Sequence, residues 1–428
     1  MRSAKALSSL GLAAAAMLAL AACSGGAEQE SPQEDIELRM TVWTSNEDHL
    51  ALFDSIAEAY MEDHPEVTDI TFDPLPFEDY TTTVTTQIAG GSAPDLAWIL
   101  ENAAPDFVDS GALLPLDETL EVTPDYGFDD LSESATALWH DESGALVAYP
   151  FSTSPFVMFT NDDLLKASGL PTSAEMQAAG DWNWDAVSEA GAAVHAATGK
   201  AGFVIRDFDY VTWDNLASVW MGWGAAPWSA DGATCTFDSP EMTEAFEFLH
   251  DAAFTKQSMP GPGTTADFFA GESAFTVTQI SRASLLAGDF AWDLLPLPEG
   301  PEGEYSMVGQ AGIAVLAEGE NAQPAAEFLA FFTNPENSKQ LAQYFPPPRV
   351  SQLNAETLAA TNPTLTPEQI ESVVIPGIET GVTRPSHTDS AEIGQEVRSA
   401  LDALWVPDAD IPGALENVCT TIDPLLAG

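Results

Sequence analysis

Tryptophan is the residue type whose positions in this sequence point most directly to a chemistry. Four of the eleven tryptophans fall within sixteen residues, at Trp213, Trp220, Trp223 and Trp228. The C–H face of a sugar ring stacks on a flat aromatic ring, and the sugar hydroxyls need charged or amide partners. The cluster therefore favours carbohydrate binding. The seven-residue spacing of Trp213 and Trp220 also fits the buried face of a core helix, and this interpretation stays open.

Sequence patterns that would indicate an enzyme or a metal site are missing. A glycosidase needs two carboxylates about 5 to 9.5 Å apart. With 67 acidic residues, chance pairs are certain and carry no information. The chain has no Gly-x-Ser-x-Gly motif, no phosphate-binding loop and no paired Cys and His, and its six histidines lack zinc-ligand spacing. We expect no enzymatic activity, no cofactor and no metal.

The charge balance is strongly acidic. Asp and Glu number 67 against 12 Lys and Arg, which gives a formal net charge of −55. Nucleic acids are bound mainly through Lys and Arg on phosphates, so a nucleic acid partner is excluded. The same shortage argues against anionic lipid surfaces and strongly anionic ligands. We interpret the acidity as a solvation feature suited to a saline habitat, where salt screens charges beyond about 8 Å.

Strand and helix patterns alternate from residue 36 to residue 99, and such elements would position the side chains that contact a ligand. Apolar and polar residues alternate from residue 36 to 44, as in a half-buried strand, and Ser45 or Asn46 can cap a following helix. Such alternation indicates βαβ units and a mostly parallel sheet, which binds ligands at its strand ends. The expected elements are a strand at 36–44, a helix that ends before Pro65, a strand at 69–72, a helix at 77–89 and a strand at 94–99.

The N-terminal segment has the features of a secretory signal. Two basic residues, Arg2 and Lys5, precede an apolar run from 10 to 22 that is too short to span a membrane comfortably. The sequence Leu-Ala-Ala-Cys-Ser-Gly-Gly at 20–26 resembles the lipobox of bacterial lipoproteins, which implies a lipid on Cys23. A simple cleavage site with a chance cysteine is the alternative. We expect a signal peptide at 1–22 and a flexible tether at 23–35.

Two cysteines remain for the secreted domain. With Cys23 assigned to the lipid, Cys235 and Cys419 form an even pair in an oxidising compartment. We predict a disulfide between them, and two unpaired thiols are the alternative that the sequence leaves open.

A series of motifs in one order resembles the family 1 extracellular solute-binding proteins of ATP-binding-cassette sugar importers, the maltose-binding-protein-like class. The resemblance extends over nearly the whole mature chain. The motifs are Trp43-Thr44-Ser45, Asp63-His64-Pro65, Phe77-Glu78-Asp79-Tyr80, Gly90-Gly91-Ser92-Ala93-Pro94-Asp95, Tyr149-Pro150, Asn161 with Asp163-Leu164-Leu165 and Gly169-Leu170-Pro171, Phe268–Phe275, Leu295–Gly303, Ala325–Phe332 and Asn334-Pro335-Glu336.

This resemblance implies a two-lobed α/β fold of the type II periplasmic-binding-protein kind. Each lobe would have a mostly parallel sheet flanked by helices, and the ligand would lie in a cleft between them, which closes by a hinge motion. The chain would cross between lobes near 149–156, 305–312 and 345–350. The implied lobes are 36–149 with 310–345 and 150–308 with 346–428.

The resemblance and the strand-end argument together give a set of ligand contacts. Trp43 lies at the end of the first predicted strand, and the turn from this strand to the next helix lines the cleft in the family. Packing at a sheet edge is the alternative for Trp43. Arg282 stands where family members often have a Trp, and its guanidinium suits paired hydroxyls, an acidic sugar or a plain ion pair. The candidates are Trp43, Ser45, Asn46, Asp95, Glu101, Asn102, Trp213, Trp220, Trp223, Gln279, Ser281, Arg282, Gly309, Gln310, Arg349 and His387.

The function implied by the resemblance is solute capture for an importer. The protein would be a monomer, held at the extracellular face of the cell membrane by the lipid on Cys23. It would bind a sugar or oligosaccharide and deliver it to the permease subunits. The acidity also suits a cationic solute such as a polyamine, which is the alternative ligand.

Overall fold

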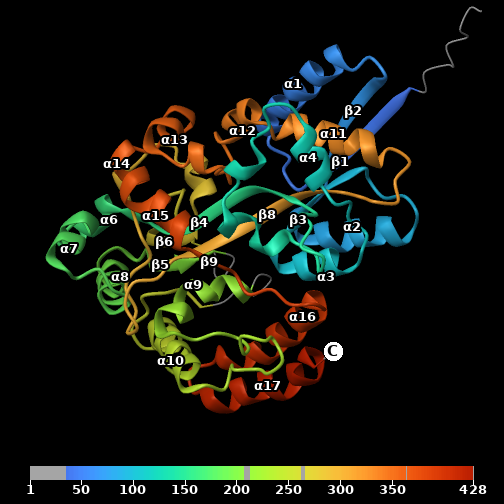
Figure 1. Cartoon of the computed structure of the whole chain (residues 1–428). Helices are drawn as coiled ribbons and strands as arrows, with labels where there is room; N and C mark the ends of the chain where they lie inside the picture. The colour runs from blue at the N-terminus through green and yellow to red at the C-terminus, as the bar shows by residue number, and fades with distance from the viewer. Residues whose placement is uncertain (1–34, 207–212, 262–265, 363, 428) are drawn as a thin grey trace, which may run out of the picture. The chain divides into compact units, whose positions relative to one another are not determined.

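The computed structural model describes residues 35–206, 213–261, 266–362 and 364–427 (Figure 1). The predicted signal peptide, Cys23 and all of the tether except Asp35 lie outside these residues. Residues 36–428 form one compact unit. None of the described helices combines the length and apolar character needed to cross a membrane.

The first elements are the predicted strand and helix series. Strand β1 pairs in parallel with both β2 and β3, as expected of βαβ units. Helix α1 begins where the side chain of Asn46 accepts a hydrogen bond of 2.8 Å from the backbone N–H of Asp48, and it ends before Pro65. These elements are β1 (Ile36–Val42), α1 (Glu47–Asp63), β2 (Val67–Pro74), α2 (Tyr80–Ala89) and β3 (Leu96–Leu100).

The rest of the described chain adds further strands and many helices. The strands are β4 (Tyr149–Asn161), β5 (Ala201–Ile205), β6 (Ser273–Gln279), β7 (Trp292–Leu295), β8 (Met307–Val315) and β9 (Val382–Thr383). The helices are α3 (Ala104–Asp109), α4 (Asp117–Val122), α5 (Glu133–Thr136), α6 (Asp162–Ala167), α7 (Ser173–Ala179), α8 (Trp184–Thr198), α9 (Ala217–Trp220), α10 (Pro240–Phe254), α11 (Ala322–Phe332), α12 (Pro335–Leu341), α13 (Ala355–Thr361), α14 (Pro367–Gln369), α15 (Ile375–Thr380), α16 (Ser390–Leu401) and α17 (Ile411–Leu426).

The described strands join into one sheet with parallel and antiparallel pairs. Its order is β2-β1-β3-β8-β4-β6-β5, with β7 paired to β4 and β9 paired to β8. The pairs β1–β2, β1–β3, β5–β6 and β8–β9 are parallel, whereas β3–β8 and the pairs that involve β4 are antiparallel. The α/β class is therefore confirmed.

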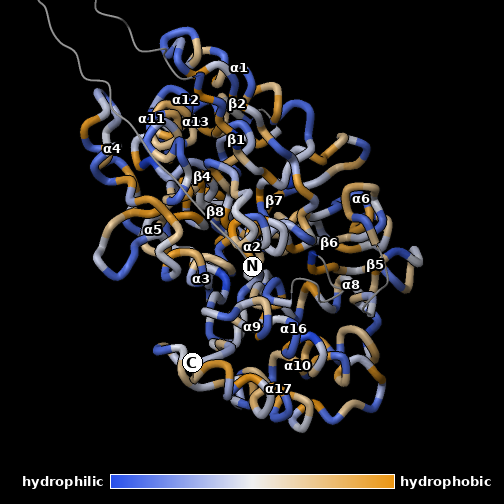
Figure 2. The backbone as a smooth tube through the Cα atoms, turned by 90° about the vertical axis from the view of Figure 1, so that its right-hand side faces the viewer, coloured by the Kyte–Doolittle hydropathy of each residue, from blue (hydrophilic) through white to orange (hydrophobic). Residues whose placement is uncertain are grey.

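The buried apolar side chains form two large cores and a smaller third core. Trp98 and Phe332 belong to the first core, and Phe203 and Trp220 to the second. Phe159 belongs to the third, together with apolar residues between 358 and 378. In Figure 2, apolar stretches of the backbone run through the region of β4 and β8. Burial of these side chains is the main favourable term for folding.

Strands β4 and β8 contribute to both large cores. Along β4, Phe151 packs in the first core and Phe156 in the second. Along β8, Met307 packs in the second core and Ala311 in the first. All residues of β4 and β8 are buried. The sequences of both strands therefore lack the alternation of apolar and polar residues that β1 shows.

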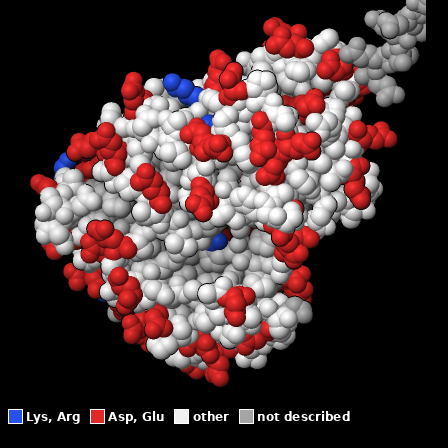
Figure 3. Space-filling view, in the orientation of Figure 1, with Lys and Arg blue, Asp and Glu red and all other residues white. Residues whose placement is uncertain are grey.

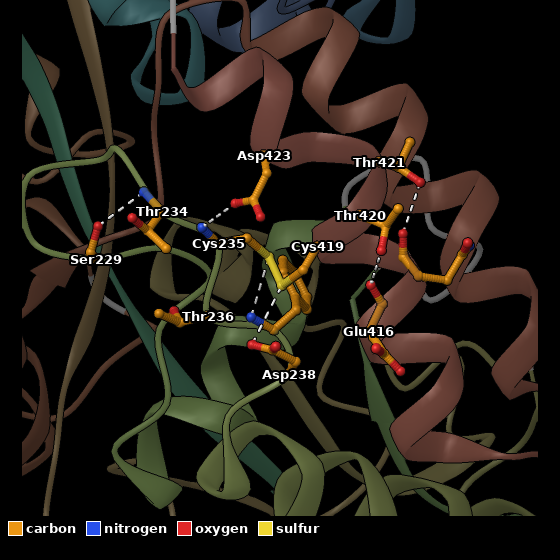
Figure 4. Close-up of a disulfide and its surroundings, with 12 residues drawn as sticks. Ser229, Thr234, Cys235, Thr236, Asp238, Glu416, Cys419, Thr420, Thr421 and Asp423 are labelled. Atoms are coloured by element: carbon orange, nitrogen blue, oxygen red, sulfur yellow. Dashed lines mark hydrogen bonds between the residues drawn. A yellow bond between two sulfur atoms is a disulfide. The ribbon is translucent and has the colours of Figure 1, made fainter.

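A disulfide joins α17 to the segment that precedes α10 (Figure 4). Cys235 and Cys419 are bonded across a sequence separation of 184 residues. The carboxylate of Asp423, one helical turn beyond Cys419, accepts a hydrogen bond of 2.8 Å from the backbone N–H of Cys235. Both cysteines are buried in the second core. The link therefore holds the C-terminal helix α17 against the segment that precedes α10, within the second core.

Candidate ligand-binding site

A pocket of about 200 Å³ lies where several strands end. Trp43, Glu101 and Arg206 directly follow β1, β3 and β5, and Arg384 directly follows β9. Ligands of open α/β sheets bind at such carboxyl ends. The pocket is lined by Trp43, Phe77, Leu100, Glu101, Phe151, Ser152, Ser154, Arg206, Asn215, Gln279, Ser281, Arg282, Gly309, Gln310, Ala311, Phe345 and Arg384.

Aromatic rings form the apolar part of the lining. Trp43 packs edge-on against Trp98 at 4.6 Å and Tyr80 at 5.2 Å between ring centroids. Phe77 and Phe151, which also line the pocket, lie 6.2 and 6.1 Å from the same ring. Trp43 itself is only half-buried. It is therefore a ring held in place by its neighbours that keeps part of its surface available for stacking.

A buried ionic network lies at one side of the pocket. The guanidinium of Arg384 is ion-paired with Glu101, lies 3.4 Å from the carboxylate of Asp214 and donates a 2.8 Å hydrogen bond to the side chain of Asn215. Glu101 is 1% and Arg384 is 6% exposed. Burial raises the pKa of Glu101, and the adjacent guanidinium opposes that rise. The network fixes Arg384 firmly, because its charge is matched by two carboxylates.

A second arginine contacts the end of β6. Arg206 donates a hydrogen bond to the side-chain carbonyl of Gln279, and its guanidinium lies 5.9 Å from the ring of Phe77. Gln279 also occupies the space beside Gly309, where a Cβ would stand 2.4 Å from the amide nitrogen of Gln279. A side chain at position 309 would therefore displace the end of the Gln279 side chain, which is free to adopt another rotamer.

Seven of the residues predicted as ligand contacts lie together in this pocket. They come from the ends of β1, β3 and β6 and from within β8, which is why their spacing in the sequence shows no pattern. They are Trp43, Glu101, Gln279, Ser281, Arg282, Gly309 and Gln310.

The structure contradicts the prediction that the tryptophan cluster contacts a ligand. Trp213, Trp220 and Trp223 are 7%, 0% and 8% exposed and belong to the second core. Trp213 stacks on Trp220 at 5.9 Å, and Trp223 packs on Phe248 at 5.0 Å. Their helical spacing thus reflects core packing, the alternative that the sequence left open.

Arg349 and His387 also lie outside the pocket. Arg349 is fully buried and donates hydrogen bonds to the backbone carbonyls of Gly127 at 3.1 Å and Thr333 at 3.0 Å. His387 contacts the carbonyl of Gly232 at 3.1 Å. Both side chains therefore have structural partners in place of a ligand.

Four predicted polar contacts near the first strands lie outside the pocket, and two of them have local partners. The side chain of Asp95 accepts a 2.8 Å hydrogen bond from the backbone of Arg39, which ties β1 to the start of β3. Asn46 caps α1. Ser45 is exposed, and Asn102 lies in the 3-10 turn after Glu101. None of these four side chains lines the pocket.

Sequence reasoning missed several pocket residues. A signal was present for two of them: the scarcity of basic residues, which singled out Arg282, applies equally to Arg206 and Arg384. The others are common residue types in unremarkable contexts and gave none. The missed residues are Phe77, Leu100, Phe151, Ser152, Ser154, Arg206, Asn215, Ala311, Phe345 and Arg384.

Comparison with known proteins agrees with this architecture. A family model described as "Bacterial extracellular solute-binding protein" matches residues 43–339. The sn-glycerol-3-phosphate-binding periplasmic protein of Pectobacterium atrosepticum is 24% identical over 358 residues, 77% of this chain and 76% of the relative. A lipoprotein of Streptomyces antibioticus is 23% identical over 342 residues, 76% of this chain and 72% of the relative.

The fold also matches solved structures. The ABC substrate-binding protein of Listeria monocytogenes, solved in complex with cycloalternan, superposes with a TM-score of 0.79 at 22% identity, and the match covers 91% of this chain and 98% of the other. The family model covers well over half of the sequence. The chain therefore belongs to the bacterial extracellular solute-binding proteins, a family of transporter binding proteins rather than enzymes, and has the two-lobed maltose-binding-protein-like fold.

Proposed function

We propose that this protein captures a sugar or short oligosaccharide and delivers it to the permease of an ABC importer. The observation that carries the proposal is the pocket itself, in which the half-buried ring of Trp43 lies among amide, hydroxyl and guanidinium groups. Such a pairing of a stacking surface with polar partners suits a pyranose. Pockets for drug-sized ligands have volumes of roughly 300 to 1,000 Å³. The volume of about 200 Å³ therefore favours a small ligand of one or two sugar rings.

We further propose that the lobes are 36–149 with 310–345 and 150–308 with 346–428, and that they close on the ligand. Support comes from the way β4 and β8 each change from one apolar core to the other within a few residues. Pocket residues come from segments of both proposed lobes, Glu101 from one and Arg282 from the other. A ligand that contacts both would stabilise the closed form that a permease recognises.

The proposed location is the extracellular face of the cell membrane, with the protein acting as a monomer anchored through a lipid on Cys23. The lipobox-like sequence and the similarity to a Streptomyces lipoprotein support the anchor. Replacing Cys23 with Ala should release the protein from the membrane fraction, since a covalent lipid is the only proposed attachment. Metabolic labelling with a lipid precursor measures this, and label kept by the variant would place the anchor elsewhere.

Ligand screening by thermal shift tests the proposed function. A ligand at 100 times its Kd adds about 2.7 kcal/mol to the free energy of unfolding. Stabilisation by mono- or disaccharides is expected. Spermidine tests the alternative of a cationic solute, which the pocket disfavours because three guanidinium groups line it. Stabilisation by spermidine alone would overturn the sugar assignment.

A further inference from the structure

A quarter of the basic residues of this chain line the pocket. Only 12 Lys and Arg occur in 428 residues, yet Arg206, Arg282 and Arg384 all line the same cavity of about 200 Å³. Among the residues that the structure describes, Glu101 supplies the one carboxylate of the lining. Figure 3 shows the contrast on one face of the molecule, where carboxylates are spread over the surface and a basic group lies in a central hollow. In a chain with a net charge of −55, three guanidinium groups therefore line one cavity.

The three arginines differ in what they bind within the protein. Arg384 is held by Glu101 and Asp214, so its charge is already matched. Arg206 donates to Gln279. Arg282 has a different environment: within the described ranges no carboxylate lies within 4 Å of it and no hydrogen bond is formed, and its guanidinium lies 5.6 Å from the ring of Phe269.

A second polar group of the pocket lacks a protein partner. Gln310 is 3% exposed, and its amide nitrogen donates to the backbone carbonyl of Ser134 at 3.3 Å, which orients the side chain. Its Oε1 is buried and accepts no hydrogen bond from any described residue. An unsatisfied buried acceptor is costly, so a hydroxyl donor on a bound molecule would satisfy it.

We propose that the ligand is an anionic sugar or polyol, with its acidic group bound by Arg282 and one hydroxyl donated to Oε1 of Gln310. This inference rests on the proposed function and narrows its substrate class. A planar guanidinium binds a carboxylate or phosphate through two parallel hydrogen bonds, and such charge-assisted bonds are about twice as strong as neutral ones. The acidic composition of the whole chain argues against anionic ligands. This argument does not hold for the pocket, because three of the 12 Lys and Arg line it.

Matched ligand pairs test the inference by isothermal titration calorimetry of the intact secreted domain. The pairs are glucose with glucuronate, galactose with galacturonate, and glycerol with sn-glycerol 3-phosphate. We expect the acidic member of at least one pair to bind tenfold or more tightly than its neutral partner. The first two pairs report a carboxylate and the third a phosphate. Preference for the neutral members overturns the inference and leaves sugar binding intact. If no member of any pair binds, the inference is also overturned, and the thermal-shift screen with other saccharides tests the proposed function separately.

Substitution of Arg282 tests whether this residue causes the preference for acidic ligands. Arg282→Gln should weaken binding of the acidic member tenfold to a hundredfold and that of the neutral member less than threefold, and Arg282→Lys should restore part of the preference. Arg398→Gln is the matched control, since it removes the same charge from an exposed position on α16. Melting temperatures verify folding of each variant. Equal losses for acidic and neutral members, or an effect of Arg398→Gln as large as that of Arg282→Gln, would overturn the assignment of Arg282.

Discussion

Removing the indole of Trp43 should weaken ligand binding far more than removing a core tryptophan. A sugar face that covers roughly 60 Å² of the ring gains about 1.5 kcal/mol at 25 cal/mol per Å². Stacking geometry adds about 0.5 to 1.5 kcal/mol. Trp43→Ala should therefore cost about 2 to 3 kcal/mol of binding free energy, roughly a 30-fold to 150-fold rise in Kd.

The same substitution also has a folding cost that the structure allows us to estimate. Trp43 contacts four rings but is only half-buried, so its truncation should lower the free energy of unfolding by about 2 kcal/mol, below the 3 to 5 kcal/mol of a fully buried Trp. Trp223 provides the matched control. It is 8% exposed in the second core, so Trp223→Ala should cost about 3 to 5 kcal/mol of stability.

Calorimetric titration and denaturant unfolding of the two variants separate binding from packing. Trp43→Ala should lose affinity while it remains folded, and Trp223→Ala should lose stability while the folded fraction keeps its affinity. An unchanged Kd in Trp43→Ala together with a large loss of stability would refute the role of this ring in binding. Trp43→Phe, which keeps a flat ring, should lie between the parent and the Ala variant.

Three further substitutions test the ion pair of Glu101 with Arg384, the disulfide between Cys235 and Cys419, and the pKa of His49. Glu101→Gln should lower the free energy of unfolding by about 3 kcal/mol in denaturant titrations, because it leaves the buried Arg384 underpaired; no change would indicate that Glu101 is protonated in the fold. Replacing Cys235 and Cys419 together by Ser should cost about 2 to 5 kcal/mol and abolish the effect of reductant on unfolding, and two alkylatable thiols in the native parent would contradict the bond. Burial lowers the pKa of His49 to about 4, so the folded state binds its proton less readily than the unfolded state. Stability should therefore fall by about 1 to 2 kcal/mol, discounted for the partly exposed ring, as pH drops from 6.5 toward 4; His49→Gln should show a shallower fall in melts over that range, and an equal fall would contradict the assignment.

The elements that the sequence predicts well are those with local signals. The alternation of β1 and the cap at Asn46 define the first strand and helix, since strand periodicity and capping depend on neighbouring residues. Strands β4 and β8 carry no comparable pattern because both of their faces are buried. Their antiparallel direction depends on how the halves of the sheet connect, which local sequence does not encode.

The site was predictable only in part for a related reason. Trp43 follows a recognisable strand, so its position at a strand end could be inferred. Arg384 follows a strand of two residues, Val382–Thr383, which is too short to give a pattern. The spacing of Trp213 and Trp220 identifies a shared helix face but does not tell whether that face meets a ligand or Phe237, with which both rings pack.

The order of the two large cores along the chain has a consequence for biogenesis. Every residue of the first core precedes residue 346, whereas the second core is completed by α16 and α17, and Cys419 follows its partner by 184 residues. During export the first core can assemble while the second still exposes apolar surface that only late segments cover. Oxidation of the two cysteines therefore waits for the late segments, and premature chain termination would leave an intermediate prone to aggregation.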